Sequence, residues 1–193
     1  MGKGRIEAFS DGVIAVIITV LVLEMKVPHG TDAAALAPVL PVFLTYVLSF
    51  IFLGIYWNNH HHLYHAVRHV HGATLWANLH LLFWLSLVPF VTGWVGTSHF
   101  APLPVAAYGA VLAGAGAAYY ILTRVLLRVH GKDSLLARAL GRDLKGKISV
   151  AIYVVAIGLA FVQPLISCAL YVLVAAIWFY PDPRFEKLIG SQS

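Results

Sequence analysis

The first long apolar segment of the chain contains ionisable residues where a membrane-spanning helix would ordinarily have none. Arg5 and Asp11 lie within or just before the apolar run from Gly12 to Leu23. A charged side chain inside a spanning helix costs about 2.5 to 3.5 kcal/mol on insertion scales and needs a partner. Asp11 is therefore a candidate functional residue. The alternative is that Arg5 and Asp11 only mark where the helix leaves the lipid headgroups.

Histidines form a second group of residues with possible chemistry, concentrated between residues 60 and 71. His61, His65 and His69 recur every four residues, which puts them on one face of a helix and would allow them to bind a metal ion or a proton. However, this stretch contains no Cys or carboxylate to complete a zinc site. We therefore expect no metal site, and expect solvated or hydrogen-bonded histidines on a cytoplasmic helix extension.

Patterns typical of enzymes and cofactor proteins are missing from the sequence. It has no phosphate-binding Gly-rich loop, no Gly-x-Ser-x-Gly turn and no His-Glu-x-x-His pair. A haem-binding bundle would need two facing histidines in mid-span, and only His80 lies well inside an apolar segment. We predict neither an enzyme nor a resident cofactor.

Composition places these residues in a membrane protein. The 193 residues are 60% hydrophobic and only 11% charged, whereas soluble domains average about 25% charged. Since a spanning helix needs about 20 apolar residues, the chain has room for about five to seven spans and almost no other domain. The net charge of +5 comes from basic residues between apolar segments. We therefore expect no nucleic-acid binding.

The apolar runs predict an all-α membrane protein with six transmembrane helices, forming a single transmembrane domain over residues 1–193. The final apolar run, from Ile148 to Tyr180, is about 50 Å long as one helix and so must turn, which Gln163-Pro164 allows. Pro89 should kink the third helix. The predicted helices are approximately 5–27, 36–57 with an extension to 71, 75–95, 105–127, 146–163 and 165–180.

Six spans place both termini on one side of the membrane. Every Lys and Arg except Lys26 then lies on that same side. Because basic residues concentrate in cytoplasmic loops, we predict a multi-pass protein of the plasma (inner) membrane with both termini cytoplasmic.

The first helix has one aliphatic face that its polar residues avoid. At about 100° per residue, Ser10 and Asp11 point to its flank and back, so we expect both to pair with neighbouring helices. An aliphatic stripe usually faces lipid or another helix, and periodicity alone does not identify a pore. The residues that share this face are Gly12, Val16, Thr19, Val20 and Leu23.

These residues resemble a known family. The segment Arg5-x-x-x-Phe9-Ser10-Asp11, followed by the apolar run to Glu24, resembles the first-helix signature of the prokaryotic transmembrane protein 175 family of potassium channels. The likeness continues in family order through Trp57-x-x-His60-His61, Asn78 and Pro89-Phe90, and covers essentially the whole chain.

The resemblance implies a homotetramer in the lipid bilayer, with four copies of the first helix lining a central pore. It implies a weakly selective potassium channel without a cofactor, whose permeant ions are K⁺. The implied hydrophobic constriction consists of Val16, Thr19, Val20 and Leu23, with Gly12 as a small pore-facing residue. The implied structural and gating network consists of Arg5, Phe9, Ser10, Asp11, Trp57, His60, His61 and Asn78.

The expected mechanism differs from that of channels with a carbonyl filter, because no Thr-Val-Gly-Tyr-Gly loop is present. A ring of aliphatic side chains gates by dewetting, and four Thr19 hydroxyls compensate a partly dehydrated cation. One alternative is a proton-coupled secondary transporter or proton-leak pathway that uses Asp11 and the cytoplasmic-end histidines. Another is a non-transporting scaffold or haem-binding bundle.

Overall fold

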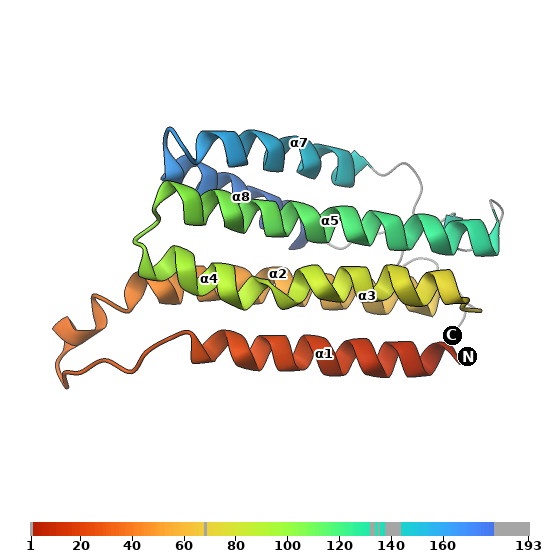
Figure 1. The fold of residues 1–193 in the computed structure, drawn as a ribbon, viewed down its shortest axis with the longest axis horizontal. Coiled ribbons are helices and arrows are strands. Elements are labelled where there is room, and N and C mark those ends of the chain that lie inside the picture. Colours follow the sequence, from red (N-terminus) through yellow and green to blue (C-terminus); the bar gives the residue numbers. More distant parts are fainter. Residues whose placement is uncertain (1, 68, 132–133, 135, 138–143, 180–193) are drawn as a thin grey trace.

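The computed structural model describes residues 2–67, 69–131, 134, 136–137 and 144–179, and every regular element in them is helical (Figure 1). A short 3₁₀ turn, η1, covers Ala33–Leu36. The α-helices are α1 (Lys3–Leu23), α2 (Leu40–His65), α3 (Gly72–Ser86), α4 (Val88–Thr97), α5 (Pro102–His130), α7 (Leu144–Leu159) and α8 (Pro164–Phe179).

Proline marks the start of several helices. Pro41, Pro89 and Pro102 lie in the first turns of α2, α4 and α5, and Pro164 is the first residue of α8. The first turn of a helix does not use its backbone N–H groups within the helix, so a residue without one is tolerated there. The turn expected at Gln163-Pro164 is present between α7 and α8.

The kink expected at Pro89 is a short break in the helix. α3 ends at Ser86 and α4 begins at Val88, with Leu87 between them. Together they form one apolar stretch of 26 residues, Gly72–Thr97, long enough to cross a bilayer.

Both ends of α2 and the end of α1 differ from the sequence expectation by several residues. Residues before α2 form η1, capped by the Asp32 side chain, so α2 begins at Leu40 rather than at residue 36. At its other end α2 stops at His65, because the chain turns there to begin α3 at Gly72. His69 consequently lies beyond the helix and does not share a face with His61 and His65. α1 also ends early, at Leu23 rather than at residue 27.

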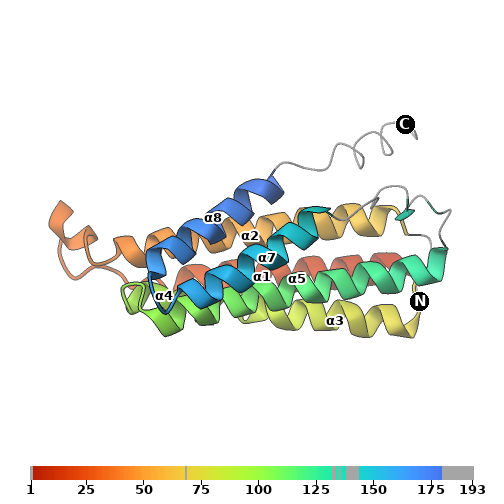
Figure 2. The same cartoon turned by 90° about the horizontal axis from the view of Figure 1, so that it is seen from above.

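The helices lie side by side along the long axis of the molecule (Figures 1 and 2). α1 forms one edge and packs on α2, α3 and α4, while α7 and α8 form the opposite edge. Among the described residues, α1, α2, α3–α4 together and α5 are long and apolar enough to cross a membrane, and α8 is a shorter apolar helix. The chain is therefore a multi-pass, all-helical membrane protein.

Basic residues gather at one end of this bundle. The start of α1, the end of α5 and the start of α7 lie at the same end (Figure 1). They carry Lys3, Arg5, Arg124, Arg128, Lys145 and Lys147, whereas Lys26 follows the other end of α1. The remaining basic residues used to predict orientation lie outside the described residues: Arg68, Lys132, Arg138, Arg142, Arg184 and Lys187.

Three buried hydroxyls, the hydroxyl cluster, tie α2, α4 and α5 together. The Ser49 oxygen on α2 lies 2.7 Å from that of Thr92 on α4 and 2.9 Å from that of Tyr108 on α5. Near one end of the same interface, a Cβ atom at Gly96 would lie 2.6 Å from the backbone Cα of Val42. Only glycine permits α4 to approach α2 so closely.

Candidate functional site

α1 has one face buried against the bundle and one face exposed. The buried residues are Ile6, Ser10, Ile14, Ile17 and Leu21. The exposed face carries Val16 (60% exposed), Val20 (39%) and Leu23 (77%), together with Gly12 and Thr19. All five residues that share the predicted aliphatic face thus lie on the outside of the single chain.

A buried network of polar side chains anchors α1 to α2 and α3. The Asn78 amide nitrogen donates to the Ser10 hydroxyl (2.9 Å), while its oxygen accepts from His60 Nε2 (2.8 Å) and from the Tyr64 hydroxyl (3.4 Å). All four residues are buried. A carbonyl oxygen can only accept, so His60 carries its proton on Nε2 in this arrangement. Both polar atoms of the Asn78 side chain therefore take part in the network.

Asp11 pairs with Trp57 of α2 and takes no part in the network around Asn78. The indole N–H of Trp57 donates to its carboxylate at 3.0 Å. The Trp57 ring also stacks on His61, with ring centroids 6.1 Å apart and planes 21° apart. The pairing expected for Ser10 and Asp11 is present, and the two residues bond to different helices.

The structure does not join all the residues of the implied network. Ser10, His60 and Asn78 form one hydrogen-bonded group, and Asp11, Trp57 and His61 form another. Arg5 and Phe9 are both exposed and belong to neither group. Tyr64 was missed by sequence reasoning, although its spacing of four residues from His60 was a usable signal.

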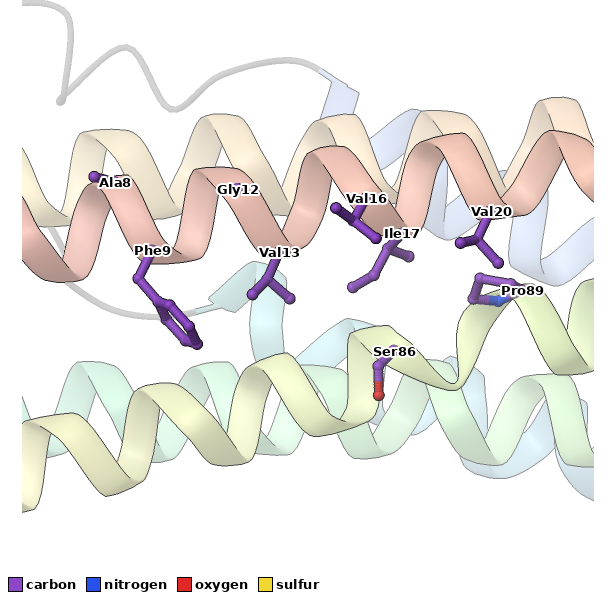
Figure 3. Close-up of a pocket in the computed structure, with 9 residues that line it drawn as sticks. All are labelled: Ala8, Phe9, Gly12, Val13, Val16, Ile17, Val20, Ser86 and Pro89. Carbon is purple, nitrogen blue, oxygen red and sulfur yellow. The ribbon is translucent and has the colours of Figure 1, made fainter.

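An apolar groove of about 680 Å³ runs beside α1 (Figure 3). Phe9, Val13 and Ile17 point from α1 toward the junction of α3 and α4, where Ser86 and Pro89 lie. Gly12, Val16 and Val20 also line the groove, so it continues onto the exposed face. The α3–α4 break forms its far wall.

Thr19 is the polar residue of the exposed face. Its hydroxyl donates to the Val16 carbonyl one turn earlier, at 2.8 Å. Since the proton is used within the helix, the oxygen keeps acceptor capacity directed outward. An exposed oxygen acceptor among aliphatic side chains is suited to a cation. His80, the histidine considered for haem, instead accepts a hydrogen bond from Trp84 on its own helix (3.0 Å).

The chain is similar in sequence to several known proteins. Residues 5–89 match the family described as endosomal/lysosomal potassium channel TMEM175. A potassium channel of Chryseobacterium sp. (strain P1-3) is 56% identical over 187 residues, which cover 97% of each chain. The human endosomal/lysosomal proton channel TMEM175 is 40% identical over 80 residues, covering 35% of this chain and 16% of that protein.

A solved structure has the same fold. It is the crystal structure of a lysosomal potassium-selective channel TMEM175 homologue from Chamaesiphon minutus, which aligns with a TM-score of 0.75 and 29% sequence identity. The alignment covers 91% of this chain and 95% of that one. The family resemblance seen in the first helix is thereby confirmed.

Proposed function

The chain belongs to the TMEM175 family of ion channels, and on that basis we propose that it forms a weakly selective potassium channel along the exposed face of α1. The family consists of channels rather than enzymes and uses no cofactor. The permeant ion of the proposed pore is K⁺, as the names of the bacterial relatives suggest.

One observation carries the proposal. Ser10 is buried and bonded to Asn78, and this fixes the rotation of α1 so that Gly12, Val16 and Thr19 face outward. A random lipid-facing surface has no need of a glycine with open space above it or of an exposed hydroxyl. Both suit a surface that passes ions.

Four copies of the chain would enclose the pore. A single exposed helix face cannot surround an ion, whereas a ring of identical subunits places the same face on the symmetry axis. The groove between α1 and the α3–α4 junction supports this assembly, because it offers an apolar surface beside the proposed pore face. A neighbouring α1 would fill it.

The constriction would consist of Val16, Thr19, Val20 and Leu23. At three of these levels, four aliphatic side chains, one from each subunit, would surround the pore. Where the pore is narrow they repel water, so they close it by dewetting. The four Thr19 side chains offer four oxygen acceptors at a level between the aliphatic ones. These partly replace the hydration shell of a cation and favour K⁺, which sheds water more readily than Na⁺. The resulting selectivity is modest.

We further propose one transmembrane domain of six spans over residues 1–193, in which α3 and α4 form a single span. The basic end of the bundle, with Lys3 and Arg128, would be cytoplasmic, and the chain would lie in the plasma (inner) membrane with both termini inside. The polar contacts of Ser10 and Asp11 would then form a cytoplasmic-end network that sets gating. Arg5 and Phe9 would join it through neighbouring subunits.

The test is reconstitution of purified protein in planar bilayers with opposed K⁺ and Na⁺ gradients. We expect a current whose reversal potential lies on the K⁺ side of zero. A reversal potential that responds to neither cation would contradict the channel. The mass of the detergent complex tests the tetramer separately.

A proton pathway is the second candidate. The chain of buried polar groups from Ser10 through Asn78 to His60 favours it, as does the name of the human relative, a proton channel. Such a pathway, whether a leak or proton-coupled transport, would use Asp11 and the histidines of this end. A pH gradient imposed on K⁺-free proteoliposomes distinguishes it, since only this candidate predicts dissipation of the gradient by the protein.

A further inference from the structure

Glu7 on α1 and His61 and His65 on α2 form a group of possible metal ligands, the Glu7–His cluster. One carboxylate oxygen and one nitrogen from each imidazole all lie within 4.8 Å of one another. The two rings are one turn apart on α2, with centroids separated by 4.4 Å. Glu7 and His61 are half-buried and His65 is exposed, so an ion could enter from solvent.

The three side chains do not satisfy one another. Among the contacts of the described residues, no hydrogen bond or ion pair joins any two of them. Lys3, one turn before Glu7, directs its ammonium to the Tyr64 carbonyl at 3.3 Å. A carboxylate and two imidazoles thus face a common point with no bond between them, and a cation at that point would bind all three.

The ligand set selects a class of ion. Imidazole and carboxylate together suit Zn²⁺ and neighbouring divalent transition metals, whereas Ca²⁺ and Mg²⁺ prefer oxygen ligands alone. Ligand atoms on a tetrahedral zinc ion lie about 3.3 Å apart, so these atoms need to close by at most about 1.5 Å. His65 is exposed and can rotate to do so, while stacking on Trp57 holds the His61 ring in place.

We propose that the Glu7–His cluster binds one divalent transition-metal ion of the zinc class, with water as the fourth ligand. The ion would cross-link the start of α1 to the last turn of α2. Sequence reasoning rejected a metal site because the histidine-rich stretch has no carboxylate, but the fold brings one from α1. The site does not depend on the proposed pore, so either proposal can fail while the other stands.

Calorimetric titration of the metal-free, full-length protein in detergent with ZnCl₂ tests the proposal. We expect one ion per chain. Glu7→Gln and His65→Gln should each weaken binding by about tenfold or more, because each removes a direct ligand. His69→Gln is the matched control, since His69 belongs to the same histidine-rich stretch but lies beyond the end of α2. Its affinity should stay within about twofold of the unchanged protein.

Thermal unfolding gives a second readout. A ligand that binds only the folded state raises the melting temperature, so Zn²⁺ should stabilise the unchanged protein and His69→Gln but not the two ligand variants. Elution from a sizing column as for the unchanged protein shows that each variant is folded. Equal zinc binding by Glu7→Gln, His65→Gln and the unchanged protein would overturn the proposal. An equal loss in His69→Gln would overturn it too, because binding would then be spread over exposed histidines.

Discussion

The side-chain amide of Asn78 donates a hydrogen bond of 2.9 Å to the hydroxyl of Ser10, and both side chains are buried. This bond joins α3 to the inner face of α1. Aliphatic packing tolerates small rotations of a helix, but a shift by one residue, about 100°, would leave both of these polar groups buried without partners. The pair therefore specifies which side chains of α1 face outward.

Asn78→Leu should destabilise the protein strongly. The substitution keeps the branched shape of the side chain but leaves Ser10, His60 and Tyr64 without their common partner, and one buried unsatisfied group costs about 1 to 3 kcal/mol. We expect a loss of about 2 kcal/mol in the free energy of unfolding, measured by denaturant titration in mixed micelles. Leu79→Ala, at an exposed neighbouring position, is the control. Similar losses in both variants would show that Asn78 does not hold α1.

Asp11→Ala should impair assembly or gating more than Val16→Ala. The first change removes the acceptor of the Trp57 indole N–H, whereas the second trims an exposed side chain. Complex mass and K⁺ flux from proteoliposomes measure the two effects. An Asp11→Ala protein with an unchanged oligomer and unchanged flux would contradict a gating role for this contact.

Thr19→Val should lower the preference for K⁺ over Na⁺. Valine has the shape of threonine but no oxygen to compensate a partly dehydrated cation. We expect the reversal potential under opposed gradients to move toward zero. Thr123→Val makes the same chemical change in α5, where the hydroxyl bonds to its own helix, and should leave the potential unchanged. If both variants or neither variant shifted the reversal potential, Thr19 would not be the residue that gives the preference for K⁺.

Val20→Ser should raise the resting K⁺ current. A hydroxyl in place of an aliphatic side chain lets water wet a narrow pore and removes the barrier to ions. Val22→Ser is a matched control, because Val22 has a similar exposure (43% against 39%) on a different face of α1. Single-channel recording of open probability separates the two variants. Equal activation by both would place the gate elsewhere.

Gly96→Ala should lower the melting temperature, whereas Gly116→Ala should not. The new methyl group at Gly96 would meet the α2 backbone at Val42, which cannot move aside as a side chain can. At Gly116 the nearest atom, the Tyr56 hydroxyl oxygen, lies at 3.7 Å, an ordinary contact distance. Differential scanning fluorimetry measures both. An unchanged melting temperature for Gly96→Ala would mean that α2 and α4 are less closely packed than described.

Much of the helical framework follows from local signals in the sequence. Pro89 and Pro164 identify the break between α3 and α4 and the turn between α7 and α8, because proline restricts its own backbone and lacks an N–H donor. The polar flank of α1 was identified from its periodicity. The end of α2 at His65 was not predicted. The stretch from there to His71 has no glycine or proline, so only packing determines where the chain turns.

The polar contacts between helices were partly predictable. Asn78 and His60 were placed in a polar network by the family resemblance, which does not identify the atoms that pair. The approach of Glu7 to His61 could not be read from spacing, because the two residues lie on different helices. Such pairs depend on how α1 is rotated and shifted against α2, and this placement is determined by the whole interface between the two helices.

The hydroxyl cluster has a consequence for the mechanics of the chain. Thr92 donates to the Val88 carbonyl at 2.7 Å, so its oxygen accepts from Ser49, which in turn must accept from Tyr108. The donors thus run in one direction, and loss of any one misdirects the rest. α2, α4 and α5 are consequently linked side chain to side chain in a fixed donor order. α1 takes no part in this cluster and is held by its own polar contacts, Ser10 with Asn78 and Asp11 with Trp57.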